Sequence, residues 1–236
     1  MKKDLLSLLD LEKEDFVALF TRALQLKKRY NRGILDKLLA GKSLGLIFDK
    51  KSTRTRVAFE TAMIQLGGHP IYMSAQDTQI SRNEPAKDTA RVLSRYIDCL
   101  AMRTFDHSLV EEFAQNSTIP VINALTDSFH PCQILSDIMT IIEHKGGYKN
   151  LKIAWVGDGN NVVNSWINAA SVIGLDLVVA CPDNYGVNHN IIEAALVKDK
   201  TNIVFTNDPK EAVKNADVVY TDVWASMGDE NELSKR

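Results

Sequence analysis

Five consecutive residues with hydroxyl or guanidinium groups have the chemistry to bind a phosphate. They are Ser52-Thr53-Arg54-Thr55-Arg56, and they lie between an apolar strand-like run and a run with helical periodicity. A helix N-terminus presents free N–H groups to an anion, and arginine forks match phosphate bidentately. The helix dipole contributes only about 0.3–1 kcal/mol and each charge-assisted hydrogen bond roughly 1.5–3 kcal/mol, so we expect the side chains to supply most of the affinity. A capped helix with solvated arginines is the alternative, and the five residues alone would favour it.

Two further polar groups follow strand-like runs in the same half of the chain. Because ligands of open α/β sheets bind beyond the carboxyl ends of strands, we expect Arg103 to lie at the same sheet edge as Ser52–Arg56. In the segment His130-Pro131-Cys132-Gln133, the proline suits the first position of a helix, which places the histidine near the cap. A neutral histidine and a glutamine amide there could stabilise a carbonyl oxygen that gains negative charge. For Arg103 alone, the alternative is a solvated arginine at a strand end. For residues 130–133 alone, the alternative is a histidine N-cap with a solvated glutamine.

Two polar loops in the second half of the chain are candidates for binding a small zwitterion. Residues 157–161 read Gly-Asp-Gly-Asn-Asn and resemble the start of a dinucleotide fingerprint, but Val162 replaces the third glycine and the expected acid is displaced to Asp183. A nicotinamide site is therefore weakly supported, and the paired asparagines favour a polar loop. Asp222 follows the last strand-like run, where its carboxylate could pair with an ammonium group. A turn around a buried Trp224 is the alternative for that loop.

The elements that must position these residues alternate between strand and helix and predict an α/β fold. We expect two domains, residues 1–146 and 147–236, each with a parallel sheet flanked by helices and divided at Gly146-Gly147. The expected strands are Ser43–Phe48, Ile71–Ser74, Cys99–Met102, Ile119–Asn123, Lys152–Val156, Leu175–Ala180, Asn202–Phe205 and Val218–Thr221. The expected helices include Thr53–Leu66, Pro85–Arg95, Ser108–Gln115, Pro131 to about His144, Val162–Ile173, His189–Lys198 and Pro209–Asn215, with an amphipathic helix before them around Phe16 to Leu24. No helix follows the last strand, so we expect the second domain to be incomplete at its C-terminal end.

The composition is that of a globular protein without an evident cofactor motif. The 236 residues are 45% hydrophobic and 25% charged, and the net charge of −2 gives no reason to expect nucleic acid or an anionic membrane as a partner. The three cysteines form no close pair, which favours a reducing cytoplasm, and neither a signal peptide nor a membrane span is expected. The histidines lack metal-ligand spacing and there is no P-loop, so we expect neither a metal nor a nucleotide.

The sequence motifs together resemble the aspartate/ornithine carbamoyltransferase family over nearly the whole chain. Ser52–Arg56, Arg103 and the His-Pro-x-Gln motif at 130–133 resemble its carbamoyl-phosphate site. The ornithine branch is indicated by His-Pro-Cys-Gln, by Gly-Asp-Gly-Asn-Asn, and by Asp-x-x-x-Ser-Met-Gly at 222–228, which resembles an ornithine-binding loop. Gln79 also fits that branch, because the aspartate branch carries a lysine in the corresponding segment.

The resemblance implies transfer of a carbamoyl group from carbamoyl phosphate to the δ-amine of L-ornithine, giving L-citrulline. It implies no metal or other cofactor, a homo-oligomer that is typically a trimer, and a Gln79 that reaches a neighbouring subunit's site. The residues implied to bind carbamoyl phosphate are Ser52, Thr53, Arg54, Thr55, Gln79, Arg103, His130 and Gln133, of which Thr55, Arg103, His130 and Gln133 act in catalysis. The residues implied to bind ornithine are Asn161, Asp222, Ser226 and Met227.

Other functions stay open at the level of sequence. One alternative is a carbamoyltransferase for another amine, such as putrescine, which needs no groups for an α-carboxylate. A second is an inactive chain that binds carbamoyl phosphate, because the family continues to a His-Cys-Leu-Pro motif and a late arginine that do not occur in this sequence. An NAD-dependent enzyme is a distant third.

Overall fold

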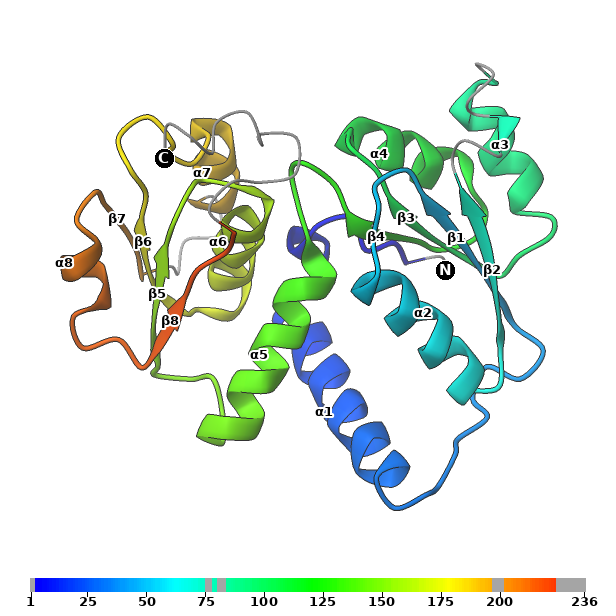
Figure 1. Cartoon of the computed structure of the whole chain (residues 1–236), viewed down its shortest axis with the longest axis horizontal. Helices are drawn as coiled ribbons and strands as arrows, with labels where there is room; N and C mark the ends of the chain where they lie inside the picture. Colours follow the sequence, from blue (N-terminus) through cyan, green and yellow to red (C-terminus); the bar gives the residue numbers. More distant parts are fainter. Residues whose placement is uncertain (1–2, 75–77, 80–83, 197–201, 224–236) are drawn as a thin grey trace. The chain divides into compact units, whose positions relative to one another are not determined.

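The chain forms two compact units (Figure 1). The computed structural model describes residues 3–74, 78–79, 84–196 and 202–223. The first unit comprises residues 1–132 and the second residues 133–236. Most of helix α5 (Pro131–Lys145) therefore groups with the second unit, although the domain boundary predicted from the sequence follows this helix.

The first unit contains a four-stranded parallel sheet in the order β2-β1-β3-β4, as the alternating pattern predicts. The strands are β1 (Ser43–Phe48), β2 (His69–Ser74), β3 (Cys99–Arg103) and β4 (Val121–Leu125). Helices α2 (Arg54–Gln65), α3 (Ala86–Leu93) and α4 (His107–Asn116) connect them, and a short 3-10 helix η1 (Leu8–Asp10) and helix α1 (Lys13–Tyr30) precede the sheet.

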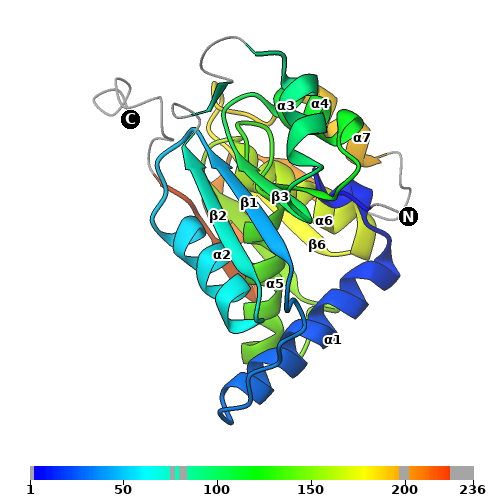
Figure 2. The ribbon, with the colours of Figure 1, turned by 90° about the vertical axis from the view of Figure 1, so that its right-hand side faces the viewer.

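Both faces of this sheet are covered by helices, and successive apolar side chains of β1 pack into clusters on opposite faces. Leu44, Leu46 and Phe48 pack in a cluster with Met63 of α2, whereas Ile47 points into a second cluster on the opposite face. Figure 2 shows α2 on one side of the sheet and α3 and α4 on the other. Two covered faces explain why the strands of this sheet read as nearly continuous apolar runs.

Strand β4 lies two residues later than the apolar run predicts. The expected strand began at Ile119, but Pro120 has no N–H group and contributes only its carbonyl, which accepts from Leu100 N at 3.0 Å. The open edge of β4 is partly covered by the N-terminal segment, because Leu5 N donates to Val121 O at 2.9 Å and Asn123 N donates to Leu5 O at 2.8 Å.

The second unit repeats the design with a parallel sheet in the order β7-β6-β5-β8. Its strands are β5 (Lys152–Val156), β6 (Asp176–Ala180), β7 (Asn202–Thr206) and β8 (Val218–Tyr220). Besides α5, its helices are α6 (Asn161–Ile173), α7 (His189–Leu196) and α8 (Pro209–Val213). Helix α6 ends at Gly174, whose φ of 71° is the left-handed conformation that glycine adopts at a helix C-terminus.

Within the described part of the chain, no helix is both long and apolar enough to cross a bilayer. The longest, α1, has 18 residues and carries many charged side chains.

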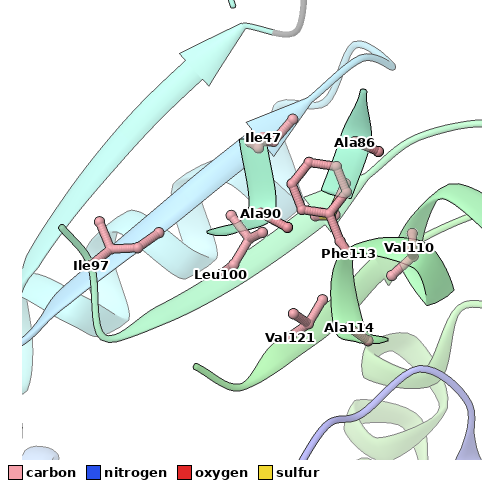
Figure 3. Packing of buried hydrophobic residues seen from close by; sticks show 10 residues of the cluster. Ile47, Ala86, Ala90, Ile97, Leu100, Val110, Phe113, Ala114 and Val121 are labelled. Carbon is pink, nitrogen blue, oxygen red and sulfur yellow. The ribbon is translucent and has the colours of Figure 1, made fainter. Parts of the chain in front are cut away.

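The cluster between the first sheet and helices α3 and α4 is centred on Phe113 (Figure 3). Phe113 is 0% exposed and points from α4 toward Ala86 and Ala90 of α3 and Leu100 of β3.

We expect Phe113→Ala to lower the free energy of unfolding by about 3–5 kcal/mol, through lost burial and the cavity left behind. Denaturant unfolding measures this change. Tyr96→Ala, at a ring that is 76% exposed, is the control and should change it by under about 1 kcal/mol; equal losses in both variants would contradict the assignment of Phe113 to the core.

Candidate functional site

The first sheet has a topological switch point between β1 and β3. From β1 the chain crosses to β2 on one side, and from β2 it returns to β3 on the other side of β1. Helices that leave in opposite directions open a crevice beyond the strand ends, where ligands of such sheets bind. Phe48 at the end of β1 pairs in register with Arg103 at the end of β3, and Asp49 N donates to Arg103 O at 2.8 Å. Ser52–Arg56 and Arg103 thus start from adjacent strand ends at one edge of the sheet.

The hydroxyl groups at the start of α2 are not used to cap that helix. Thr53 occupies the N-cap position, but its side chain makes no capping hydrogen bond. Arg54 is exposed, while Ser52 and Thr55 are half-buried. The capping part of the alternative is therefore not seen at Thr53, whereas the exposed Arg54 is solvated as that alternative expects.

Arg56, in contrast, is held along its own helix. Its Nε donates to Glu60 Oε1 at 2.9 Å, and its guanidinium lies 3.4 Å from the ring centre of Tyr72. Of the two arginines expected to present forks to a phosphate, Arg56 is therefore engaged within its own unit, and Arg54 stays the candidate.

Arg103 is a buried cation with unused hydrogen-bonding capacity. It is 5% exposed, its Nη1 donates to Thr55 Oγ1 at 3.4 Å, and its Nε finds no hydrogen-bond partner among the described residues. Burial and the nearby positive charge of Arg54 both lower the pKa of Arg103, yet a guanidinium remains protonated in proteins. A buried positive charge with an unsatisfied donor favours an anionic ligand at this position.

His130 lies in the same unit and is neutral near pH 7. The side chain is 8% exposed, and burial followed by the charge of Arg103 lowers its pKa to about 4. A neutral imidazole can donate a hydrogen bond to an oxygen without adding another charge near Arg103. This state fits the carbonyl-binding role that the sequence suggests for His130.

Gln133 belongs to the second unit, where two neighbours orient it. Its Nε2 donates to Asp137 Oδ1 at 2.9 Å, one helical turn later on α5. Burial raises the pKa of Asp137, and hydrogen bonds from Gln133 and the Tyr220 hydroxyl oppose that rise. Gln133 also makes a side-chain hydrogen bond with Tyr220, the second of its two neighbours. Asp137 was not predicted from the sequence, although its spacing of four residues from Gln133 on one helix is a signal that could have identified it.

The second sheet has its own switch point, between β5 and β8, and two candidate residues lie there. Asn161 begins α6 directly after the loop that follows β5, and the exposed Asp222 follows β8. Asn160 joins the two loops, because its Nδ2 donates to Asp222 Oδ2 at 2.9 Å while its Oδ1 accepts from Val162 N and Val163 N at 2.9 and 3.2 Å. The asparagine pair thus combines a helix cap at 160 with a half-buried polar group at 161.

The glycine-rich start of this loop has a structural explanation. A Cβ on Gly159 would lie 2.4–2.5 Å from backbone atoms of Gly186 and Val187, and Gly159 N donates to Tyr185 O at 2.7 Å. The close approach that glycine permits at this position is made by the chain's own loop rather than left open for a pyrophosphate. This packing further weakens the dinucleotide interpretation of residues 157–161.

For the remaining candidate residues the structure gives fewer contacts. Gln79 is exposed in the segment that joins β2 to α3. Ser226 and Met227, together with Trp224, lie outside the described residues. Cys132 is half-buried, and desolvation raises the pKa of its thiol to about 12, in keeping with the absence of any chemistry assigned to it from the sequence. No group of three His, Cys, Asp or Glu side chains converges among the residues that the structure describes.

The buried state of His130 gives a prediction. We expect its imidazole to titrate near pH 4, and nuclear magnetic resonance of the side chain can follow this, with His130→Gln identifying the signal. Because the folded pKa lies below the unfolded value of about 6.5, this group stabilises the fold fully above pH 6.5 and loses that effect as the pH falls toward 4. The wild-type chain should therefore lose more unfolding free energy than His130→Gln between pH 7 and pH 4.5. A titration near pH 6.5 would contradict the burial of His130.

Comparison with known proteins matches one domain of a single family to each half of the chain. Residues 3–143 match the family model for the aspartate/ornithine carbamoyltransferase carbamoyl-P binding domain, and residues 149–236 match that for the Asp/Orn binding domain. The chain is 54% identical to the ornithine carbamoyltransferase of Syntrophus aciditrophicus and 51% identical to that of Geobacter sulfurreducens, in each case over 100% of this chain and 78% of the relative.

Solved structures give the same result. The chain is similar to ornithine carbamoyltransferase from Pyrococcus furiosus, with a TM-score of 0.93 and 47% identity over 99% of this chain and 76% of that one. It is also similar to the anabolic ornithine carbamoyltransferase from Campylobacter jejuni, with a TM-score of 0.91 and 43% identity over 100% of this chain and 77% of that one. The chain therefore belongs to the aspartate/ornithine carbamoyltransferase family.

Proposed function

We propose that this chain transfers the carbamoyl group of carbamoyl phosphate to the δ-amine of L-ornithine, giving L-citrulline and phosphate. The observation that carries the proposal is the carboxyl edge of the first sheet, where the hydroxyl-rich turn, a buried arginine with an unsatisfied Nε and a neutral histidine belong to one unit. Relatives of this chain that share half of its residues are named ornithine carbamoyltransferase. A reaction of this kind serves arginine biosynthesis, and the urea cycle where that cycle operates.

The phosphate half of the donor is assigned to the turn before α2. Ser52, Thr53, Arg54 and Thr55 supply hydroxyl, guanidinium and backbone N–H donors at the helix N-terminus. The charges of Arg54 and Arg103 compensate a dianion. Binding it also removes the cost of a buried guanidinium with an unpaired Nε.

The carbonyl oxygen of carbamoyl phosphate is assigned to Thr55, Arg103, His130 and Gln133. When the δ-amine of ornithine attacks the carbonyl carbon, a C–N bond forms and this oxygen gains negative charge. Collapse of the tetrahedral intermediate breaks the C–O bond to phosphate, which leaves with the electron pair, and the attacking nitrogen loses a proton. Donors held in place before the reaction stabilise the developing charge, and loss of one typically costs about 2.7–4 kcal/mol in the barrier.

The acceptor is assigned to the second switch point. Asn161, Asp222, Ser226 and the backbone of Met227 are proposed to hold the α-amino and carboxylate groups of ornithine. The exposed Asp222 carboxylate, oriented by Asn160 at 2.9 Å, suits an ammonium group. Because donor and acceptor are assigned to different units, turnover requires the two to be brought together, and positioning supplies much of the rate.

The wider setting is also proposed from the family. We place the enzyme in the cytoplasm, as a homo-oligomer, typically a trimer, in which the exposed Gln79 completes the carbamoyl-phosphate site of a neighbouring subunit. The reaction as assigned uses no metal or other cofactor, because phosphate is already a good leaving group.

The phosphate assignment is tested with Arg54→Ala. Loss of a charge-assisted hydrogen bond worth roughly 1.5–3 kcal/mol should weaken carbamoyl-phosphate binding about 10- to 100-fold, as measured by calorimetry in the cold alongside citrulline formation. The control is Arg95→Ala, at an exposed arginine beyond the end of α3, which should bind normally. Near-normal use of carbamoyl phosphate by Arg54→Ala would overturn the assignment.

The acceptor assignment is tested with Asp222→Asn. Removing the carboxylate should weaken binding of norvaline, which keeps the α-amino and carboxylate groups but lacks the reactive amine, at least about tenfold, as expected for a lost charged hydrogen bond. Binding of carbamoyl phosphate should not change. Asp217→Asn, at the opposite end of β8, is the control, since Asp217 accepts only from Lys152 N at 2.9 Å among its described contacts. Turnover of putrescine in preference to ornithine would instead identify a carbamoyltransferase for another amine.

A further inference from the structure

A lysine is buried directly before the phosphate-binding turn. Lys50 lies two residues before Ser52, and its side chain is 5% exposed. Its ammonium pairs with Asp127 Oδ1 and lies 4.3 Å from the centre of the Phe105 ring. A buried ammonium is costly unless it is paired, so this placement calls for a physical reason.

The three partners come from three different loops at the carboxyl edge of the first sheet. Lys50 belongs to the loop between β1 and α2, which continues into the phosphate-binding turn. Phe105 belongs to the loop after β3, two residues beyond Arg103, and Asp127 to the loop after β4, three residues before His130. The Lys50 ammonium therefore links the three loops next to Ser52, Arg103 and His130.

Backbone hydrogen bonds join the same loops. Asp127 N donates to Phe105 O at 2.9 Å, and Thr104 N donates to Leu125 O at 3.0 Å. These bonds connect the second and third loops to each other. The phosphate-binding turn and the loop before it are joined to them by the bond from Asp49 N, by the bond from Arg103 Nη1 to Thr55 Oγ1, and by the ammonium of Lys50. The aromatic face and the carboxylate together replace the water that the ammonium loses.

The two side chains of this ion pair differ in how far they are exposed to solvent. Asp127 is 60% exposed on its side chain, whereas Lys50 is covered. The covered ammonium contacts Asp127 and Phe105 and is shielded from solvent, so we do not assign it a direct contact with a ligand. The carboxylate can hydrate when it is unpaired, but the ammonium cannot.

We propose that Lys50 is a positioning residue, whose ammonium joins the phosphate-binding turn to the loops of Arg103 and His130 through Phe105 and Asp127. The inference rests on the proposed function, because it assumes that these loops bind carbamoyl phosphate together. A displacement of about 1 Å between binding groups is enough to cost on the order of 100-fold in rate. A lysine that fixes three loops thus acts on binding without touching the ligand.

The test replaces the ammonium while keeping the apolar stem, in Lys50→Met. We expect carbamoyl phosphate to bind about 10- to 100-fold more weakly by calorimetry, as for other displaced binding groups. The imidazole signals of His130 should shift in the same samples, since its loop is held through Asp127. Asp127→Asn should weaken binding similarly, and the double variant should be no worse than either single one because the two residues act as a unit.

The stability of the variants gives an independent readout. Asp127→Asn leaves a buried ammonium without its carboxylate, whereas Lys50→Met leaves an exposed carboxylate that water can solvate. Asp127→Asn should therefore lower the midpoint of thermal unfolding more than Lys50→Met. If Asp127→Asn does not fold, the midpoint of thermal unfolding of the double variant, which has neither charge, is compared with that of Lys50→Met.

A matched ion pair at the other end of the same strands is the control. Lys42 Nζ contacts Asp98 Oδ1 at 2.8 Å before β1 and β3, and the Lys42 side chain is 58% exposed, in contrast to the covered Lys50. Lys42→Met and Asp98→Asn should leave carbamoyl-phosphate binding and the His130 signals unchanged. Wild-type binding by Lys50→Met, or equal weakening by Lys42→Met, overturns the inference while leaving the proposed function intact. Failure of the wild-type chain to bind carbamoyl phosphate overturns both.

Discussion

The parallel pairing of β1 with β3 is the constraint on which the first half-site depends. The register that sets Phe48 beside Arg103 brings a turn near residue 52 and a side chain at 103 to one place, although about fifty residues separate them in the chain. Neither the helix N-terminus nor the arginine is unusual alone. Their meeting at a switch point turns two ordinary strand ends into an anion site.

Burial then gives these groups their chemical character. The same enclosure that leaves Arg103 Nε without a partner also keeps His130 uncharged, so the site combines fixed positive charge with a neutral donor. In a dry environment such charges act more strongly than in water. The core beneath the site, formed by residues such as Leu100 and Phe113, keeps the strands that carry these groups in place.

Much of this arrangement could be predicted from the sequence, because it follows from local rules. Alternating strand and helix runs gave the parallel sheets, and the rule for strand ends placed Arg103 beside the turn at 52–56. The contact of Arg56 with Tyr72, the burial of Lys50 and the pairing of Leu5 with the edge of β4 were not predictable, because each depends on partners beyond the local sequence. The ring of Tyr72 and the carboxylate of Asp127 leave no periodic signal near the residues that they contact.

The repeated switch point has a consequence for how such a chain can change its specificity. Each sheet carries its candidate ligands on loops, while its core lies among strands and helices that those loops do not alter. The acceptor preference could therefore diverge by exchange of the loops after β5 and β8, with the donor half inherited unchanged. A protein engineer seeking a new amine acceptor would graft loops onto the second sheet and leave the first sheet as a conserved module.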